Sequence, residues 1–531
     1  MTSPRVTHFL VWTMMGALAF SARAFDSPEA VITAYVKALE EARWDDAELC
    51  WDTRTVERSH RLGIAYTDVP IKLDCASPLP AALMNMSPQT ASAGEELSWT
   101  VSAEDVTADR DTMRFTVWLV SKTDDPATAY YTEKTSRGWR LTSPLYYYSR
   151  GWKVRQTEYV DVYYADESLV NDHACLAMDG VIETVGAKLG LTPDDFAALR
   201  QERIDYFLGS GDDMRRMTGF ETQGMADLQT DAVVSRSLPH EHELTHLLVN
   251  YRLKRLPLYT LPLLQEGLAA YCGGRWSKSP QAIAYQGCIT LSNEIGRLDD
   301  LLTRAGFLDP AVGAEVSYPI AALFAGFLLE RWGIETYLTL YAALSGSDDQ
   351  IGSFDAGRVK ATIEMVYGVS WADMASGFEQ YWKQLPLRGV LPDTSRPSGR
   401  PDFGIETAGV RVSIWNDTGL VHVVVDLPAE VHEGVLLIPS ASQTRSSTYR
   451  SWLFAERLPR ATYSGDHIGI RFSASEAAVY DFLTNKLLAS YIEALSPQPG
   501  YRDSVSGTLR FAVAADLLRD IDLARARLVV P

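Results

Sequence analysis

The sequence predicts a multidomain α+β protein, and three observations lead to this fold class. The chain has 531 residues, and at roughly 150 residues per domain this length suggests three domains. Its composition is 46% hydrophobic and 22% charged, which is typical of folded globular proteins. In the middle third, strand-like patterns come first and helical patterns follow, which is an α+β arrangement.

Residues 1–24 have the pattern of a secretory signal peptide. Arg5 and His8 precede a mostly apolar run at 9–20, and Ala22-Arg23-Ala24 supplies the small residues that signal peptidase accepts. Cleavage before Phe25 predicts an exported protein, periplasmic or secreted. The alternative is an N-terminal membrane anchor, although the apolar run is short for one. No later segment approaches about 18 uninterrupted apolar residues, so we expect no membrane span after signal removal.

The chain is acidic, with 49 Lys+Arg against 68 Asp+Glu and a net charge of −19. The signal segment holds two Arg and no acid, so the mature chain carries 47 − 68 = −21. This charge repels phosphate backbones and anionic membrane surfaces. We therefore expect no nucleic-acid partner. An acidic polymer is equally unexpected as a substrate, unless the cleft is locally basic.

Five cysteines suit an oxidising compartment but are too sparse for a disulfide scaffold. Two pairs are near in sequence, Cys50 with Cys75 and Cys272 with Cys288, which leaves Cys175 over. Disulfides and buried free thiols both remain open at this point.

Residues 25–150 are predicted to form an α+β domain. A helix begins at Pro28, with Val31, Ile32, Tyr35, Val36 and Leu39 at helical spacing. Alternating strand patterns follow at 97–101, 113–120, 129–134 and 138–141. The segment resembles the NTF2-like fold, chiefly through its opening helix at 27–47. That fold implies a curled sheet able to hold a ligand, or a packing or partner-binding module.

The second predicted domain covers 151–392, with strands near 153–165, 203–208 and 232–234 and mostly helices from Pro239 to Gln384. A stretch rich in Pro, Gly and Ser follows, and we take 393–402 as the linker. The third domain, 403–531, is strand-rich, and we expect a small β domain with an inserted helix or two. Its His432 and His467 are isolated, so we expect no site there.

His242-Glu243-Leu244-Thr245-His246 is an HExxH sequence. Residues i and i+4 lie one turn apart on a helix face, so both imidazoles can reach one metal ion. Glu243 can then reach a metal-bound water and act as general base. A second helix is predicted at 261–271 with Gly273-Gly274 as its stop. Its Glu266 completes a His₂Glu set that leaves a fourth position for water.

These two helices resemble the gluzincin zinc metallopeptidases, the thermolysin-like peptidase MA group. The likeness rests on 242–246 and 265–271, continues weakly at 318–333 and 366–382, and covers roughly 155–390. It implies one Zn²⁺ ion bound by His242, His246 and Glu266, with Glu243 as base and proton shuttle. It also implies a thermolysin-like fold, a small sheet followed by helices, in which the strand before the HExxH helix pairs with substrate. That role would fall to 231–235.

Further roles follow less directly from the resemblance. Tyr318 opens the next long helix and is the candidate oxyanion donor, with a core or surface aromatic as the alternative. Tyr271 points away from Glu266 and is expected to pack in the core. His240 faces away from His242 and is expected to support a ligand or the local structure rather than to be a fourth ligand. Some gluzincins have an acid four residues after the glutamate ligand, which orients a histidine ligand. This position is Ala270 here, so the partner that orients the histidine is unidentified.

The sequence thus predicts an exported zinc metallopeptidase that hydrolyses peptide bonds of a peptide or protein substrate. The alternative is a noncatalytic pseudo-peptidase, an envelope or extracellular binding protein that retains the zinc site. A protein partner for either flanking domain, the choice between endo- and exopeptidase, and the oligomeric state stay open.

Overall fold

The computed structural model describes the chain between residues 24 and 530 and divides it into two compact units, 1–60 with 64–150 and 61–63 with 151–531. The residues left undescribed within this range are 42, 62–98, 107–111, 120–127, 221, 229–230, 255–258, 347, 386–389, 393–399, 418–419, 429–430, 432, 440–465, 474–475, 482–485, 493–507, 515–517 and 519–520. The predicted signal at 1–24 lies outside the described residues except for its last position. Mixed α and β structure in several sheets confirms the α+β prediction.

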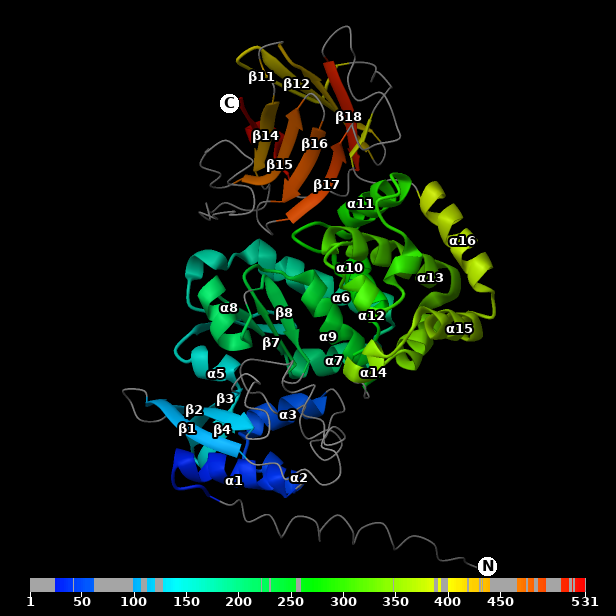
Figure 1. Cartoon of the computed structure of the whole chain (residues 1–531). Helices are drawn as coiled ribbons and strands as arrows, with labels where there is room; N and C mark the ends of the chain where they lie inside the picture. The colour runs from blue at the N-terminus through cyan, green and yellow to red at the C-terminus, as the bar shows by residue number, and fades with distance from the viewer. Residues whose placement is uncertain are drawn as a thin grey trace, which may run out of the picture. The chain divides into compact units, whose positions relative to one another are not determined.

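The first unit contains helices and one antiparallel sheet of four strands (Figure 1). Its helices are α1 (Pro28–Glu40), α2 (Trp44–Glu48), α3 (Thr53–Arg61) and α5 (Pro144–Tyr148), and its strands are β1 (Trp99–Val106), β2 (Thr112–Leu119), β3 (Thr128–Thr135) and β4 (Gly138–Thr142). The apolar face of α1 buries Val31, Ile32 and Tyr35 against Trp51 and Tyr130. The predicted helix at Pro28 and the antiparallel strands after it are thus confirmed.

The second unit begins with a five-stranded sheet in the order β5-β6-β7-β9-β8. The strands are β5 (Lys153–Gln156), β6 (Val160–Tyr164), β7 (Ile204–Leu208), β8 (Gly224–Asp227) and β9 (Ala232–Ser235). β6, β7 and β9 are parallel, whereas β5 and β8 are antiparallel edges. All five residues of β7 are buried, as expected for a central strand covered on both faces.

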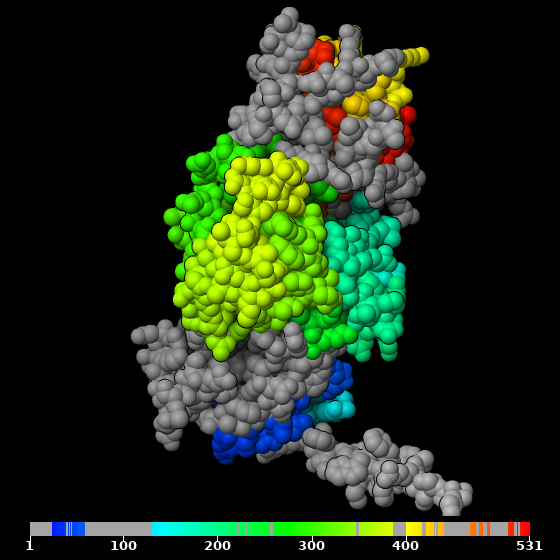
Figure 2. Space-filling model, turned by 90° about the vertical axis from the view of Figure 1, so that its right-hand side faces the viewer, coloured from blue at the N-terminus to red at the C-terminus, as the bar shows by residue number. Residues whose placement is uncertain are grey.

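Helices follow this sheet, as predicted from Pro239 to Gln384. α6 (Asp172–Leu189) and α7 (Pro193–Gln201) lie between β6 and β7, and α8 (Gly211–Thr218) lies between β7 and β8. The helices after the sheet are α9 (Glu241–Leu253), α10 (Pro262–Gly273), α11 (Pro280–Ser292), α12 (Arg304–Phe307), α13 (Ala314–Ala343), α14 (Asp348–Gly352), α15 (Ala356–Tyr367) and α16 (Trp371–Gln384). On the face seen in Figure 2, the lime and yellow residues of the last of these helices make up much of the surface.

α9 and α10 pack against each other and α10 also packs on α13, which is buried along residues 319–328. Gly267 allows the close approach of α10 to α13, because a Cβ there would lie 2.7 Å from the carbonyl oxygen of Ala321. None of the helices in the described part of the chain combines the length and apolarity that a bilayer crossing needs.

The described strands between residues 390 and 530 form two five-stranded antiparallel sheets. One sheet has the order β10 (Val390–Pro392), β18 (Thr508–Ala514), β13 (Leu420–Asp426), β12 (Val410–Asp417) and β11 (Phe403–Thr407); the other has β17 (Lys486–Ile492), β16 (Glu476–Asp481), β15 (Asp466–Ser473), β14 (Glu433–Pro439) and β19 (Arg527–Val529). One apolar core joins both, as in a sandwich.

Two details differ from the prediction for this region. The only helical segment among its described residues is a short 3₁₀ turn at Leu523–Arg525, where we expected an inserted helix or two. β10 lies at the end of the predicted second domain, before the linker at 393–402, yet it pairs with β18 as an edge strand, a position that tolerates its Pro392. His432 and Cys75 lie outside the described residues.

Candidate metal centre

The three predicted metal ligands converge at the contact between α9 and α10. His242 and His246 are both buried on α9, and their rings meet edge to face with centroids 4.9 Å apart. Glu266 comes from α10 and is 22% exposed at its side chain. Its Oε2 lies 3.0 Å from Nε2 of His242 and 3.6 Å from Nε2 of His246. One ligand atom from each residue falls within 4.8 Å of the others.

These distances fit a metal ion. With bonds of about 2.0–2.1 Å, two ligand atoms of a tetrahedral zinc ion stand about 3.3 Å apart, between the two separations from Glu266. Two imidazole nitrogens and one carboxylate oxygen are also a donor set that zinc accepts. Burial opposes ionisation of Glu266, yet His246 and then His242 hold the pKa of its carboxyl well below the usual value.

A backbone carbonyl orients the first histidine. Nδ1 of His242 lies 2.9 Å from the carbonyl oxygen of Gly274, the residue after α10. A carbonyl oxygen can only accept, so Nδ1 carries the proton and the lone pair of Nε2 is left for a metal ion that Glu266 would also bind. The orienting partner left unidentified at Ala270 is thus the Gly274 backbone. Gly273 lets the two helices approach each other, since a Cβ there would lie 2.6 Å from the backbone nitrogen of His242.

Glu243 lies beside the edge strand of the sheet. Its Oε2 accepts a hydrogen bond from the backbone nitrogen of Ala226 in β8 at 2.9 Å. The resemblance placed the substrate-pairing strand at 231–235, but β9 has β7 on one side and β8 on the other. That placement is therefore wrong. The strand next to Glu243 that pairs on only one side, among the described strands, is β8.

Tyr318 lies near the ligands, in the second turn of α13. Its ring centroid is 6.3 Å from that of His242. Burial first, and then the charge of Glu266, raise the pKa of Tyr318 above its usual value. Its ring also contacts Phe307, with centroids 5.1 Å apart, and Trp276, with centroids 5.6 Å apart. Both alternatives for Tyr318, a hydroxyl donor and a packed aromatic, are compatible with this position.

Arg275 is a residue of the site that the sequence did not reveal. Its Nη1 lies 2.9 Å from Nε2 of His242 and 3.3 Å from Oε2 of Glu266. Its Cζ stands 3.5 Å from the centroid of the Tyr318 ring. No spacing rule assigns a role to an Arg that follows a glycine pair, so the only signal was its nearness in sequence to the end of the Glu266 helix.

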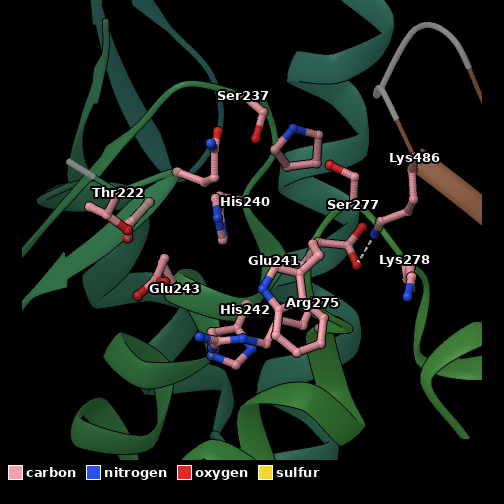
Figure 3. A pocket seen from close by; sticks show the side chains of 15 residues that line it. Thr222, Ser237, His240, Glu241, His242, Glu243, Arg275, Ser277, Lys278 and Lys486 are labelled. Carbon is pink, nitrogen blue, oxygen red and sulfur yellow. Dashed lines mark hydrogen bonds and ion pairs between the residues drawn. The ribbon is translucent and has the colours of Figure 1, made fainter. Parts of the chain in front are cut away.

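A cavity of about 290 Å³ opens beside these residues. Figure 3 shows Glu241, His242, Glu243 and Arg275 grouped at it, with the ion pair of Glu241 and Lys486 as a dashed line. The lining comprises Thr222, Gln223, Gly224, Ser237, Pro239, His240, Glu241, His242, Glu243, Gly273, Arg275, Trp276, Ser277, Lys278 and Lys486. Lys486 comes from β17. In the same strand, the carbonyl oxygen of Leu487 accepts a hydrogen bond from the backbone nitrogen of Ser279 at 2.8 Å.

The remaining predicted residues play other parts. His240 precedes α9 and lies against Gly224, where a Cβ would be 2.4 Å from Nε2. Burial lowers the pKa of His240 to about 4. Tyr271 packs on α13 at Gly326, as expected of a core residue. Cys175, Cys272 and Cys288 are buried free thiols, so the sequence-near pair Cys272 with Cys288 does not form a disulfide here.

No protein-family model matches this chain, and a search of curated proteins finds no match either.

Proposed function

We propose that this protein is an exported zinc metallopeptidase of gluzincin type, which hydrolyses peptide bonds with Glu243 as general base. The observation that carries the proposal is the convergence of His242, His246 and Glu266, with one ligand atom from each within 4.8 Å of the others. Glu243 lies one position from a ligand on the same helix and borders an open cavity. A bound zinc ion would lower the pKa of a water molecule and polarise the scissile carbonyl.

The chain's own residues would divide the remaining work. Glu243 accepts the proton from the attacking water and passes it to the leaving nitrogen, and the Ala226 N–H holds its carboxylate in place. The open edge of β8 offers backbone groups to an extended peptide. Because the Ala226 N–H of β8 bonds the Glu243 carboxylate, a peptide that lies along β8 would have its backbone beside Glu243. Tyr318 is proposed to donate to the developing oxyanion.

The finer assignments of the chain's parts belong to the same proposal. We propose an NTF2-like domain at 25–150, a gluzincin-like peptidase domain at 151–392 and a β-rich domain at 403–531, with export directed by residues 1–24. The five-stranded sheet followed by α9 and α10 supports the second assignment. The four-stranded antiparallel sheet with α1 packed on it supports the first.

The test compares the protein with its Glu243→Gln variant, both purified from residue 25 onward. Bound zinc is measured by elemental analysis, and cleavage of an unstructured protein is followed by mass spectrometry. We expect about one zinc per chain in both proteins, and a fall in kcat of about 10²–10⁴-fold in the variant. Zinc bound without cleavage by the wild type would favour the noncatalytic binding protein instead. Full zinc occupancy in His242→Ala would contradict the ligand assignment.

A further inference from the structure

Arg275 is held in a strained turn next to the metal ligands. The backbone nitrogen of Arg275 donates to the carbonyl oxygen of Lys278 at 3.1 Å, and that of Lys278 donates to Arg275 at 2.8 Å. Between them, Trp276 and Ser277 have φ values of +49° and +57°. Two successive positive φ values define the tight turn that Asn-Gly normally occupies. Non-glycine residues in this region are strained, and such strain concentrates at functional sites.

The guanidinium of Arg275 faces the ligand atoms themselves. The described acceptors of its Nη1 are Nε2 of His242 and Oε2 of Glu266. Its Nε is buried and has no hydrogen-bond partner among the described residues. The face of the guanidinium stacks on the Tyr318 ring, with Cζ 3.5 Å from the ring centroid. Stacking fixes the plane of the group and directs its N–H bonds sideways, toward the ligand atoms.

A metal ion and Arg275 cannot use the same lone pairs. Nε2 of His242 has a single lone pair once Nδ1 carries the proton for Gly274. When that lone pair binds a metal ion, the guanidinium loses His242 as an acceptor and shares the Glu266 oxygen, which keeps a second lone pair, with the ion. A half-buried cation with too few acceptors is costly, and a neighbouring dication raises that cost further. Arg275 then has unused N–H donors, its Nε among them, that can bind an anionic partner from outside the chain.

The other cations of the cavity already have partners. Lys486 pairs with Glu241. Lys278 donates to Gln286 at 2.8 Å and lies 3.6 Å from a Glu315 oxygen. Arg275 is thus the cavity cation whose only carboxylate, among the described residues, belongs to the metal set. The lining contains three basic side chains, Arg275, Lys278 and Lys486, and two acidic ones, Glu241 and Glu243, whereas the whole chain has a net charge of −19.

We propose that Arg275 binds a carboxylate of the substrate and so selects peptides with a negative charge beside the scissile bond. A planar guanidinium matches a carboxylate with two parallel hydrogen bonds. The carboxylate has two sources, the free C-terminus of a peptide or an Asp or Glu side chain. This inference rests on the proposed peptidase function, but the binding of the carboxylate can be measured without turnover.

Binding is measured by calorimetry on zinc-loaded Glu243→Gln protein, with peptides that differ in one group. One peptide is neutral and amidated, a second has a free C-terminus, and an amidated series places Glu, or Gln in its stead, at successive positions. We expect the free C-terminus, or Glu at one position, to bind about ten- to hundredfold more tightly than its neutral match. The arm that gains identifies the source of the carboxylate.

Variants at two cavity cations assign the effect. Arg275→Gln in the Glu243→Gln background should remove the preference, and Arg275→Lys should restore part of it, because a lysine keeps the charge but not the paired donors. Lys278→Gln is the matched control and should keep the preference. Zinc content is measured for each variant. Equal affinity of charged and neutral peptides for the parent protein overturns the proposal, as does a preference that Lys278→Gln abolishes and Arg275→Gln retains.

Turnover by the protein with Glu243 intact separates the two proposals. Cleavage of charged and neutral peptides with equal KM, unchanged in Arg275→Gln, overturns the role of Arg275 and leaves the peptidase standing. Carboxylate binding that depends on Arg275, with no peptide cleaved, supports the role of Arg275 and contradicts the peptidase.

Discussion

His242 donates a hydrogen bond through Nδ1 to the carbonyl oxygen of Gly274, at 2.9 Å. This bond ties the first metal ligand on α9 to the residue that ends the helix of Glu266. It sets the tautomer of the imidazole, so Nε2 is the nitrogen available to a metal ion. Gly274 has φ 70° and ψ −163°, and a Cβ there would lie 2.0 Å from the Lys278 oxygen. Only glycine fits.

Gly274→Ala is therefore expected to abolish tight zinc binding. The added Cβ must displace the turn at Lys278 and move the carbonyl that holds His242. The matched control is Gly333→Ala, because Gly333 has φ 80° and ψ 171° but no atom within 4 Å of its ideal Cβ. The control has similar backbone strain, so it should lose stability and keep its zinc. Zinc content by elemental analysis decides the prediction, and equal zinc in both variants contradicts it.

Tyr318→Phe is expected to lower kcat about 10²–10³-fold, the usual cost of one oxyanion donor. The change removes the hydroxyl but keeps the ring on which Arg275 stacks, so zinc content and KM should stay near those of the wild type. Steady-state kinetics on one fluorogenic peptide provides the measurement. Phe307→Leu serves as a control for the packing of the Tyr318 ring, 5.1 Å away between centroids. Full activity in Tyr318→Phe would identify Tyr318 as a packed aromatic.

Removal of zinc by a chelator is expected to destabilise the second unit selectively. A ligand present at a thousandfold above its Kd stabilises a fold by about 4 kcal/mol, which corresponds to a Tm difference of about 5 °C in a unit of this size. His242, His246 and Glu266 all lie in the second unit, so its melting transition should move and that of the first unit should not. Differential scanning calorimetry with dipicolinate measures both. Glu266→Gln should show a much smaller shift, and an equal shift there contradicts the assignment.

The ligand set was predictable from the sequence because helical spacing determines it. His242 and His246 are four residues apart on one helix, and Glu266 lies on the next helix, between a Pro start and a Gly stop. The orienting Gly274 was not predictable, since its role belongs to a backbone carbonyl and no side chain signals it. Arg275 depends on a turn whose positive φ values fall on Trp and Ser, residues that do not predict such a turn.

The edge strand shows a different limit. The chain passes through β8 before β9, yet β9 lies inside the sheet and β8 forms its edge. The last strand before the HExxH helix is therefore not the strand at the site. Local patterns predict that a segment is a strand, but its neighbours in a sheet depend on long-range pairing. The same reason explains β17, whose Lys486 reaches the cavity from more than 200 residues away in sequence.

Asp195 is expected to make the second unit sensitive to acid. It is buried at the start of α7, where it accepts from the nitrogen and the hydroxyl of Thr192, both at 2.8 Å, and from Lys254 at the end of α9. Burial alone would raise the pKa of Asp195, but the bonds from Lys254 and Thr192 outweigh it, and the pKa is lowered from 3.8. The folded state thus binds this proton less readily than the unfolded state.

A lowered pKa means that the carboxylate contributes stability above the unfolded pKa, and that this contribution is lost as the pH falls through the folded pKa. Asp195→Asn should therefore lower the free energy of unfolding by about 1 kcal/mol near neutral pH, and the difference from wild type should shrink below about pH 4. Urea unfolding at a series of pH values measures it. Asp194→Asn is the control, because Asp194 is exposed in the same helical turn. A difference between Asp195→Asn and wild type that stays constant down to pH 3 would show that the Asp195 charge contributes nothing to holding α7 against α9.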